Sequence, residues 1–67
     1  MQNADIIRKG VEYIEQNLKT DITPEELANM AGYSVWHYQR MFAQTVGVPL
    51  AAYINRRRLD RALSEIG

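Results

Sequence analysis

The side chains best suited to chemistry in this sequence lie between Gly32 and Gly47, in the stretch GYSVWHYQRMFAQTVG. One side of a helix over this stretch is apolar at helical spacing and consists of Tyr38, Met41, Phe42 and Val46. Trp36, Gln39 and Arg40 lie outside that stripe, so we expect them on the surface. Arg and Gln carry forked hydrogen-bonding groups that match base edges in a DNA major groove, and an apolar ring can contact a thymine methyl group. The stretch therefore predicts a recognition helix over residues 35–46.

Catalytic and metal-binding chemistry have little support in the residue types. His37 is the only histidine and the sequence has no cysteine, so no set of nucleophile, base and orienting residue can be assembled around it. A zinc site would need carboxylates plus this one imidazole, and we expect His37 to contact a phosphate or solvent instead. Glu25 and Glu26 form a pair only because they share a helix-capping turn. We predict no enzyme activity, no cofactor and no metal.

Composition favours a single soluble globular domain. The chain has 67 residues, of which 46% are hydrophobic and 24% are charged. No apolar run approaches the roughly 18 residues of a transmembrane helix, and the N-terminus lacks the pattern of a signal peptide. We expect a cytoplasmic protein that does not associate with a membrane.

The charges are distributed unevenly although the net charge is 0. Residues 1–35 carry three basic and six acidic side chains, a net charge of −3, whereas residues 36–67 carry five and two, a net charge of +3. Every basic residue in the later half is an arginine. This asymmetry favours a nucleic-acid partner. At most two members of the run Arg56-Arg57-Arg58 can face one DNA backbone, because consecutive helical residues point in different directions.

The elements that would position these side chains are all helical. An amphipathic helix over about residues 4–19 is predicted by apolar residues that step by four, three and four, namely Ile7, Val11, Ile14 and Leu18. Gly10 lies inside it at a cost of about 1 kcal/mol relative to Ala, so it either permits a close helix approach or is merely tolerated.

Two short helices joined by a tight turn are predicted over about residues 24–46. Thr23-Pro24 begins the first with a capping side chain and a proline at the first helical position, and Gly32 suits a left-handed position at its end. Ser34 then caps the second helix. The small residue Ala28, the flexible Gly32 and the apolar anchors of the second helix together predict a helix-turn-helix. The alternative is an ordinary helical hairpin in a three-helix bundle.

A fourth helix is predicted over about residues 50–66, with an apolar face that changes side halfway along. At about 100° per residue, Tyr53 and Ile54 lie near Leu50 on one side. The opposite side carries Leu59, Ala62, Leu63 and Ile66. One small body cannot easily cover both sides of a straight helix, so this is interpreted as a linker helix whose second half packs on something else. The alternative is that its last two turns bend back or fray.

From about Ile7 to Ile66 the sequence resembles the first helix-turn-helix and linker helix of the AraC/XylS transcription regulators. The residues that carry the resemblance are Ala28, Gly32, Tyr33, Ser34, Arg40, Met41, Phe42, Gly47, Tyr53, Arg58, Leu59 and Ala62. The run Trp36-His37 followed by Gln39-Arg40-Met41-Phe42 is most similar to the branch that contains the MarA and Rob activators. This sequence has Pro49 where relatives often have a capping Ser before the linker helix.

The resemblance implies an all-α fold: a small, homeodomain-like helical bundle with a helix-turn-helix, followed by a long linker helix. It also implies sequence-specific binding to double-stranded DNA by the N-terminal half of a bipartite domain. The second helix-turn-helix, which this sequence does not contain, would pack on Leu59, Ala62, Leu63 and Ile66.

The resemblance implies roles for individual side chains as well. Trp36, Gln39 and Arg40 would contact bases, whereas Ser34, His37, Arg57 and Arg58 would contact the DNA backbone. RNA polymerase would be a further partner of a full-length protein. The alternative function is a protein-interaction module that uses the Trp36 surface or the face from Leu59 to Ile66.

Overall fold

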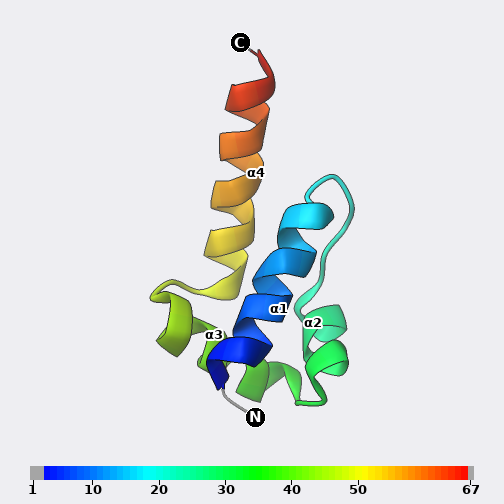
Figure 1. The fold of residues 1–67 in the computed structure, drawn as a ribbon, viewed down its shortest axis with the longest axis vertical. Coiled ribbons are helices and arrows are strands. Elements are labelled where there is room, and N and C mark those ends of the chain that lie inside the picture. The colour runs from blue at the N-terminus through cyan, green and yellow to red at the C-terminus, as the bar shows by residue number, and fades with distance from the viewer. Residues whose placement is uncertain (1–2, 67) are drawn as a thin grey trace.

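Four helices follow one another along the chain (Figure 1). The computed structural model describes residues 3–66, apart from the side chains of Asn3 and Ile66. The helices are α1 (Asn3–Gln16), α2 (Pro24–Ala31), α3 (Val35–Val46) and α4 (Leu50–Ile66), and no strand occurs among the described residues. The predicted all-α bundle is confirmed. None of these helices is both long and apolar enough to cross a lipid bilayer.

The first helix, expected to reach about residue 19, ends at Gln16. The side-chain amide of Asn17 donates to the Tyr13 carbonyl at 2.8 Å, and the Asn17 backbone N–H donates to the Ile14 carbonyl, only three residues back, at 3.1 Å. These bonds replace the four-residue ladder of an α-helix with a tighter turn. Leu18 remains buried beyond the helix end, so the apolar spacing continues past the helix itself.

The caps of α2 and α3 have the geometry that their residue types favour. The hydroxyl oxygens of Thr23 and Ser34 each accept a hydrogen bond at 3.2 Å from the backbone N–H three residues further on. Gly32 ends α2 with a φ of 80°, and Gly47 ends α3 with a φ of 93°. Both angles lie in the left-handed region that glycine adopts most easily. The turn between α2 and α3 is therefore determined by local sequence.

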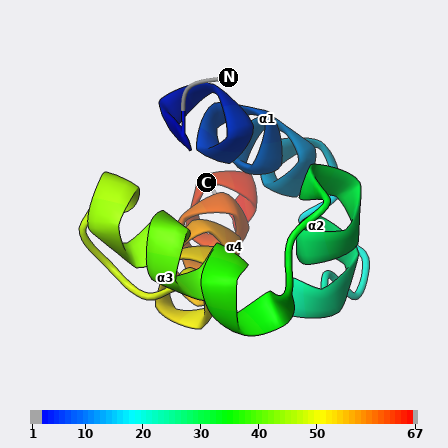
Figure 2. The ribbon, with the colours of Figure 1, turned by 90° about the horizontal axis from the view of Figure 1, so that it is seen from below.

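The core lies between α1, α2, α3 and the first turns of α4. Seen from below, α1, α2 and α3 surround one end of the molecule and α4 leads away behind them (Figure 2). The buried side chains are Ile7, Ile14, Leu18, Leu27, Ala28, Tyr38, Met41, Phe42, Leu50 and Ile54. Gly10 lies against Tyr38 so closely that a methyl group on Gly10 would collide with the Tyr38 hydroxyl. Of the two interpretations of Gly10, the structure supports close helix approach.

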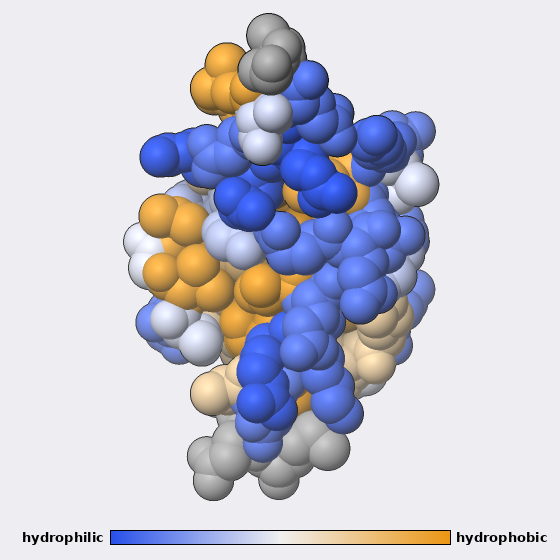
Figure 3. All heavy atoms as spheres, turned by 45° about the horizontal axis from the view of Figure 1, so that its top comes forward, coloured by the Kyte–Doolittle hydropathy of each residue, from blue (hydrophilic) through white to orange (hydrophobic). Residues whose placement is uncertain are grey.

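The two halves of α4 have different surroundings. Leu50 and Ile54 are buried, whereas Leu59, Ala62 and Leu63 are exposed. The helix continues to Ile66 without bending back, and its later half extends beyond the ends of the other helices (Figure 1). Figure 3 shows apolar surface interrupting the hydrophilic covering of the face that includes this end. The side chain of Ile66 lies outside the described part of the structure.

Candidate nucleic-acid interface

The helix α3 lies across the end of the molecule opposite the C-terminus (Figures 1 and 2). Three aromatic or apolar side chains fix its orientation, because Tyr38, Met41 and Phe42 are 1%, 5% and 0% exposed. The Phe42 ring also packs edge-on against Tyr53 of α4, with 5.5 Å between the ring centroids. With this side held in the core, the opposite side of α3 must face outward.

Trp36 and Arg40 form the centre of that outward side. Trp36 is 68% exposed, and the Arg40 guanidinium carbon lies 5.3 Å from the centroid of the indole ring. This is a cation–π contact between residues one helical turn apart. The contact orders two long side chains that would otherwise sample many rotamers. It therefore holds an aromatic face and a forked hydrogen-bond donor at one place on the surface.

Gln39 shares this side of α3 by helical geometry, because residues 36, 39 and 40 lie within about 100° of arc. It is exposed, and α3 contains no acidic residue. His37 and Gln44 join Trp36, Arg40 and Met41 around a shallow hollow of about 250 Å³. The structure thus brings together the three residues predicted to contact bases and one predicted to contact the backbone.

Ser34 and His37 stand at the N-terminal end of the same surface. The Ser34 oxygen accepts from the His37 backbone N–H, which leaves the hydroxyl hydrogen available for another partner. The His37 ring lies 4.8 Å from the Tyr33 ring, centroid to centroid, at 37° between the planes. Tyr33 thus orients the imidazole, a role that was not predicted although the two aromatic residues are four apart in the sequence.

Arg57 and Arg58 of α4 are engaged elsewhere. Arg57 donates from Nε and Nη2 to the two carboxylate oxygens of Glu15 in α1, at 2.7 and 2.9 Å, and from Nη1 to Asp60 at 3.2 Å. Arg58 donates to the backbone carbonyls of Leu18 and Thr20, just after α1, at 3.1 and 2.6 Å. Contact with a DNA phosphate would require either arginine to leave these partners. Their predicted backbone contacts therefore stay a prediction, one that the geometry of the free domain does not favour.

Glu15 was not recognised from the sequence as a structural partner. Its side chain is 33% exposed, and the hydrogen bonds from Arg57 hold the pKa of its carboxyl below the usual value. The same bonds, together with the charge of Glu15, raise the pKa of the Arg57 guanidinium. This two-point pairing of a guanidinium with a carboxylate is geometrically specific. It joins α1 to the middle of α4 and helps to set the direction in which α4 leaves the bundle.

Comparison with known proteins gives relatives of one kind. The chain is 41% identical over 64 residues to the transposon Tn10 TetD protein of Escherichia coli, and 40% identical over 63 residues to the HTH-type transcriptional activator AarP of Providencia stuartii. It is 40% identical over 62 residues to the transcriptional regulator Rob of Salmonella typhimurium. These matches cover 96%, 94% and 92% of this chain, but 46%, 47% and 22% of the respective relatives. The chain thus spans about half the length of the first two and less of Rob. No family model matches it, and no solved structure does.

Proposed function

Because this chain belongs to the AraC/XylS family, in the branch that includes MarA and Rob, we propose that it is a DNA-binding module of a transcription regulator. In this proposal α3 enters the major groove of duplex DNA. The observation that carries it is the outward side of α3, where Trp36 and Arg40 are held together over an otherwise uncharged helix. A large aromatic side chain that is 68% exposed beside forked donors suits a partner rich in flat acceptor edges.

Each side chain of this surface has a role that follows from its chemistry. Arg40 places two hydrogen bonds on the O6 and N7 of a guanine, and Gln39 pairs with the N6 and N7 of an adenine. Trp36 supplies apolar contact to a thymine methyl group. Ser34 and His37, at the N-terminal end of α3, lie where the DNA backbone passes the end of a helix in the groove. Base contacts by the first group give specificity, whereas contacts by the second group set the register.

A second helix-turn-helix on the exposed face of α4 completes the proposed domain. Leu59 and Leu63 are 56% and 60% exposed, which is costly for large apolar side chains on a helix that is otherwise well formed. The bidentate pair of Glu15 and Arg57 fixes the direction of the helix that carries them. We assign Arg57 and Arg58 primarily to this positioning task. The same exposed face also favours a second function, association with another protein without DNA.

Fluorescence of Trp36 tests the proposal, because it is the only tryptophan in the chain. Mixed-sequence duplex DNA is titrated into the domain at low and at moderate salt, and binding is followed in parallel by the anisotropy of labelled DNA. A saturable change in Trp36 emission that weakens with salt is the expected result. An unchanged spectrum without any rise in anisotropy contradicts DNA binding by this module. Self-association that salt does not weaken then favours the protein-interaction function.

A further inference from the structure

A second hollow lies on the other side of α3, away from the Trp36 surface. It has a volume of about 230 Å³ and is bounded by α1, α2 and α3. Its walls are mostly apolar and include Ile6, Leu27, Met30 and Ala31, with Gly10 leaving room beside α1. For comparison, an apolar cavity of about 150 Å³ in another protein accommodates benzene. The hollow is therefore large enough for one ring with a short substituent.

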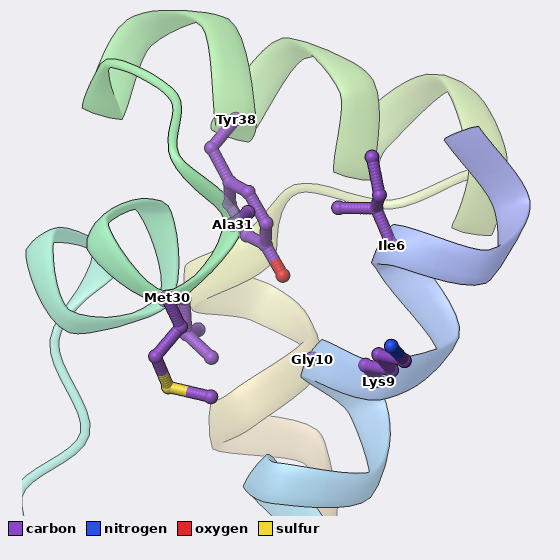
Figure 4. Close-up of a pocket in the computed structure, with 7 residues that line it drawn as sticks. Ile6, Lys9, Gly10, Met30, Ala31 and Tyr38 are labelled. Carbon is purple, nitrogen blue, oxygen red and sulfur yellow. The ribbon is translucent and has the colours of Figure 1, made fainter. Parts of the chain in front are cut away.

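One polar group faces this apolar space. Figure 4 shows the Tyr38 side chain descending from α3 between α1 and α2, with its hydroxyl oxygen directed toward the gap beside Gly10. The hydroxyl is buried and has no hydrogen-bond partner among the described residues. Burial raises the pKa of this hydroxyl, so it remains a protonated donor at neutral pH. A buried donor without an acceptor is unusual in a folded protein, and an incoming acceptor would satisfy it.

The rim of the hollow can admit a small molecule. Met30 is 57% exposed and its side chain flanks the opening (Figure 4). A methionine is unbranched and rotates readily, and its sulfur makes favourable contacts with aromatic rings. Lys9 lies on the opposite side of the rim and is exposed. Its methylene stem can cover the apolar space while the ammonium group stays in water.

We propose that this hollow binds a compact, uncharged ring compound that carries one carbonyl acceptor, and that the acceptor bonds to the Tyr38 hydroxyl. A neutral carbonyl fits better than a carboxylate, because the interior offers a single donor and a buried charge would need several. An aromatic ketone or ester of one ring has the matching size and polarity. The ring fills the space between Ile6 and Leu27, and the carbonyl occupies the end next to Gly10.

Acetophenone is a suitable probe, and ethylbenzene is its match without the acceptor. Binding is followed by amide NMR of the whole chain, with the dissociation constant taken from saturating shifts. Acetophenone is expected to shift the amides of Ile6, Gly10, Leu27 and Ala31 and to leave those around Trp36 unchanged. Tyr38→Phe should weaken acetophenone roughly threefold to tenfold, the change that one neutral hydrogen bond contributes, and should leave ethylbenzene unaffected.

Tyr33→Phe is the matched control, because it removes a tyrosine hydroxyl outside the hollow and should change neither probe. Three outcomes overturn the proposal. They are absence of saturable binding, shifts confined to the Trp36 surface, and equal affinity of acetophenone for the wild type and a folded Tyr38→Phe variant. None of these measurements involves DNA, so the result is independent of the proposed function.

Discussion

The contact between Gly10 and Tyr38 predicts a reversal in the effect of one methyl group. In the wild type, a methyl group on Gly10 would collide with the Tyr38 hydroxyl, which is buried and cannot swing into solvent. Without the oxygen, the nearest atom of residue 38 is the ring carbon Cζ at 3.4 Å, and the next neighbour is Leu27 Cδ2 at 3.9 Å. Both of these distances allow ordinary van der Waals contact. Gly10→Ala should therefore be harmful beside Tyr38 and tolerated beside phenylalanine.

The magnitude follows from two opposing contributions. Alanine in the middle of α1 stabilises the helix by about 1 kcal/mol relative to glycine. Inserting a methyl group into a packed interior costs about 1–3 kcal/mol. In the wild type the sum is a loss of up to about 2 kcal/mol, whereas in the Tyr38→Phe background the gain of about 1 kcal/mol remains. The coupling between the two substitutions is thus about 1–3 kcal/mol. In a bundle of this size the whole free energy of unfolding is only about 3–5 kcal/mol.

Urea unfolding of the four proteins of the double-mutant cycle, followed by helical circular dichroism, measures each contribution. Tyr38→Phe alone should raise the free energy of unfolding by about 1 kcal/mol or more, because it removes a buried hydroxyl without a partner. Gly10→Ala should lower the free energy in the wild type and raise it in the Tyr38→Phe variant. Equal effects of Gly10→Ala in both backgrounds would refute the close approach and show that Gly10 is only a tolerated residue.

The pairing of α1 with α4 and the surface of α3 make three further predictions. The Glu15 pKa is lowered in the folded state, so its contribution to stability is present above the ordinary carboxyl pKa and is lost as the pH falls through the lowered value; acid unfolding of Glu15→Gln should lose that component, whereas that of Glu12→Gln, at an exposed site of the same helix, should match the wild type. Arg58→Met removes two hydrogen bonds to backbone carbonyls after α1 and should lower the free energy of unfolding by about 1–2 kcal/mol, whereas Arg56→Met should cost less than about 0.5 kcal/mol in the same urea assay. Arg40→Ala should relax the preference at one base pair by about 1–3 kcal/mol; an unchanged ranking of single-base DNA variants at constant salt would exclude base contact by Arg40.

The parts of the fold that follow from local sequence were predictable. Thr23, Ser34, Gly32 and Gly47 act within one or two turns of the chain, so their residue types were enough to place the ends of α2 and α3. The buried stripe of α3 was predictable for a similar reason, since helical periodicity separates its core side from its outer side. The exposure of Trp36 followed directly, because the side chains one helical face away already formed the core.

Interactions between distant segments could not be predicted from these patterns. Arg57 and Glu15 are 42 positions apart, and Arg58 and Leu18 are 40 apart. Helical periodicity gives the direction of an arginine side chain but not the group that waits there. The hydroxyl of Tyr38 was missed in the same way, because its burial beside Gly10 depends on how closely α1 crosses α3. The charge asymmetry of the sequence was interpreted wholly as a sign of an external partner, although part of it is used within the fold.

This internal use of charge limits how steeply DNA binding by the domain can depend on salt. Among the described residues, Arg56, Arg57 and Arg61 each pair with a carboxylate, and Arg58 bonds to neutral carbonyls, so Arg40 is the arginine of residues 36–67 with no such partner. Each phosphate neutralised contributes about 0.9 to the slope of log affinity against log salt. The pairs of Arg56 and Arg61, at 3.4 and 3.8 Å, are exposed and cheap to exchange for phosphates, which allows a slope of about −3. A steeper slope would mean that basic residues beyond these three contact DNA, and a loss of the steep component in Arg57→Met would show that the bond to α1 opens on binding.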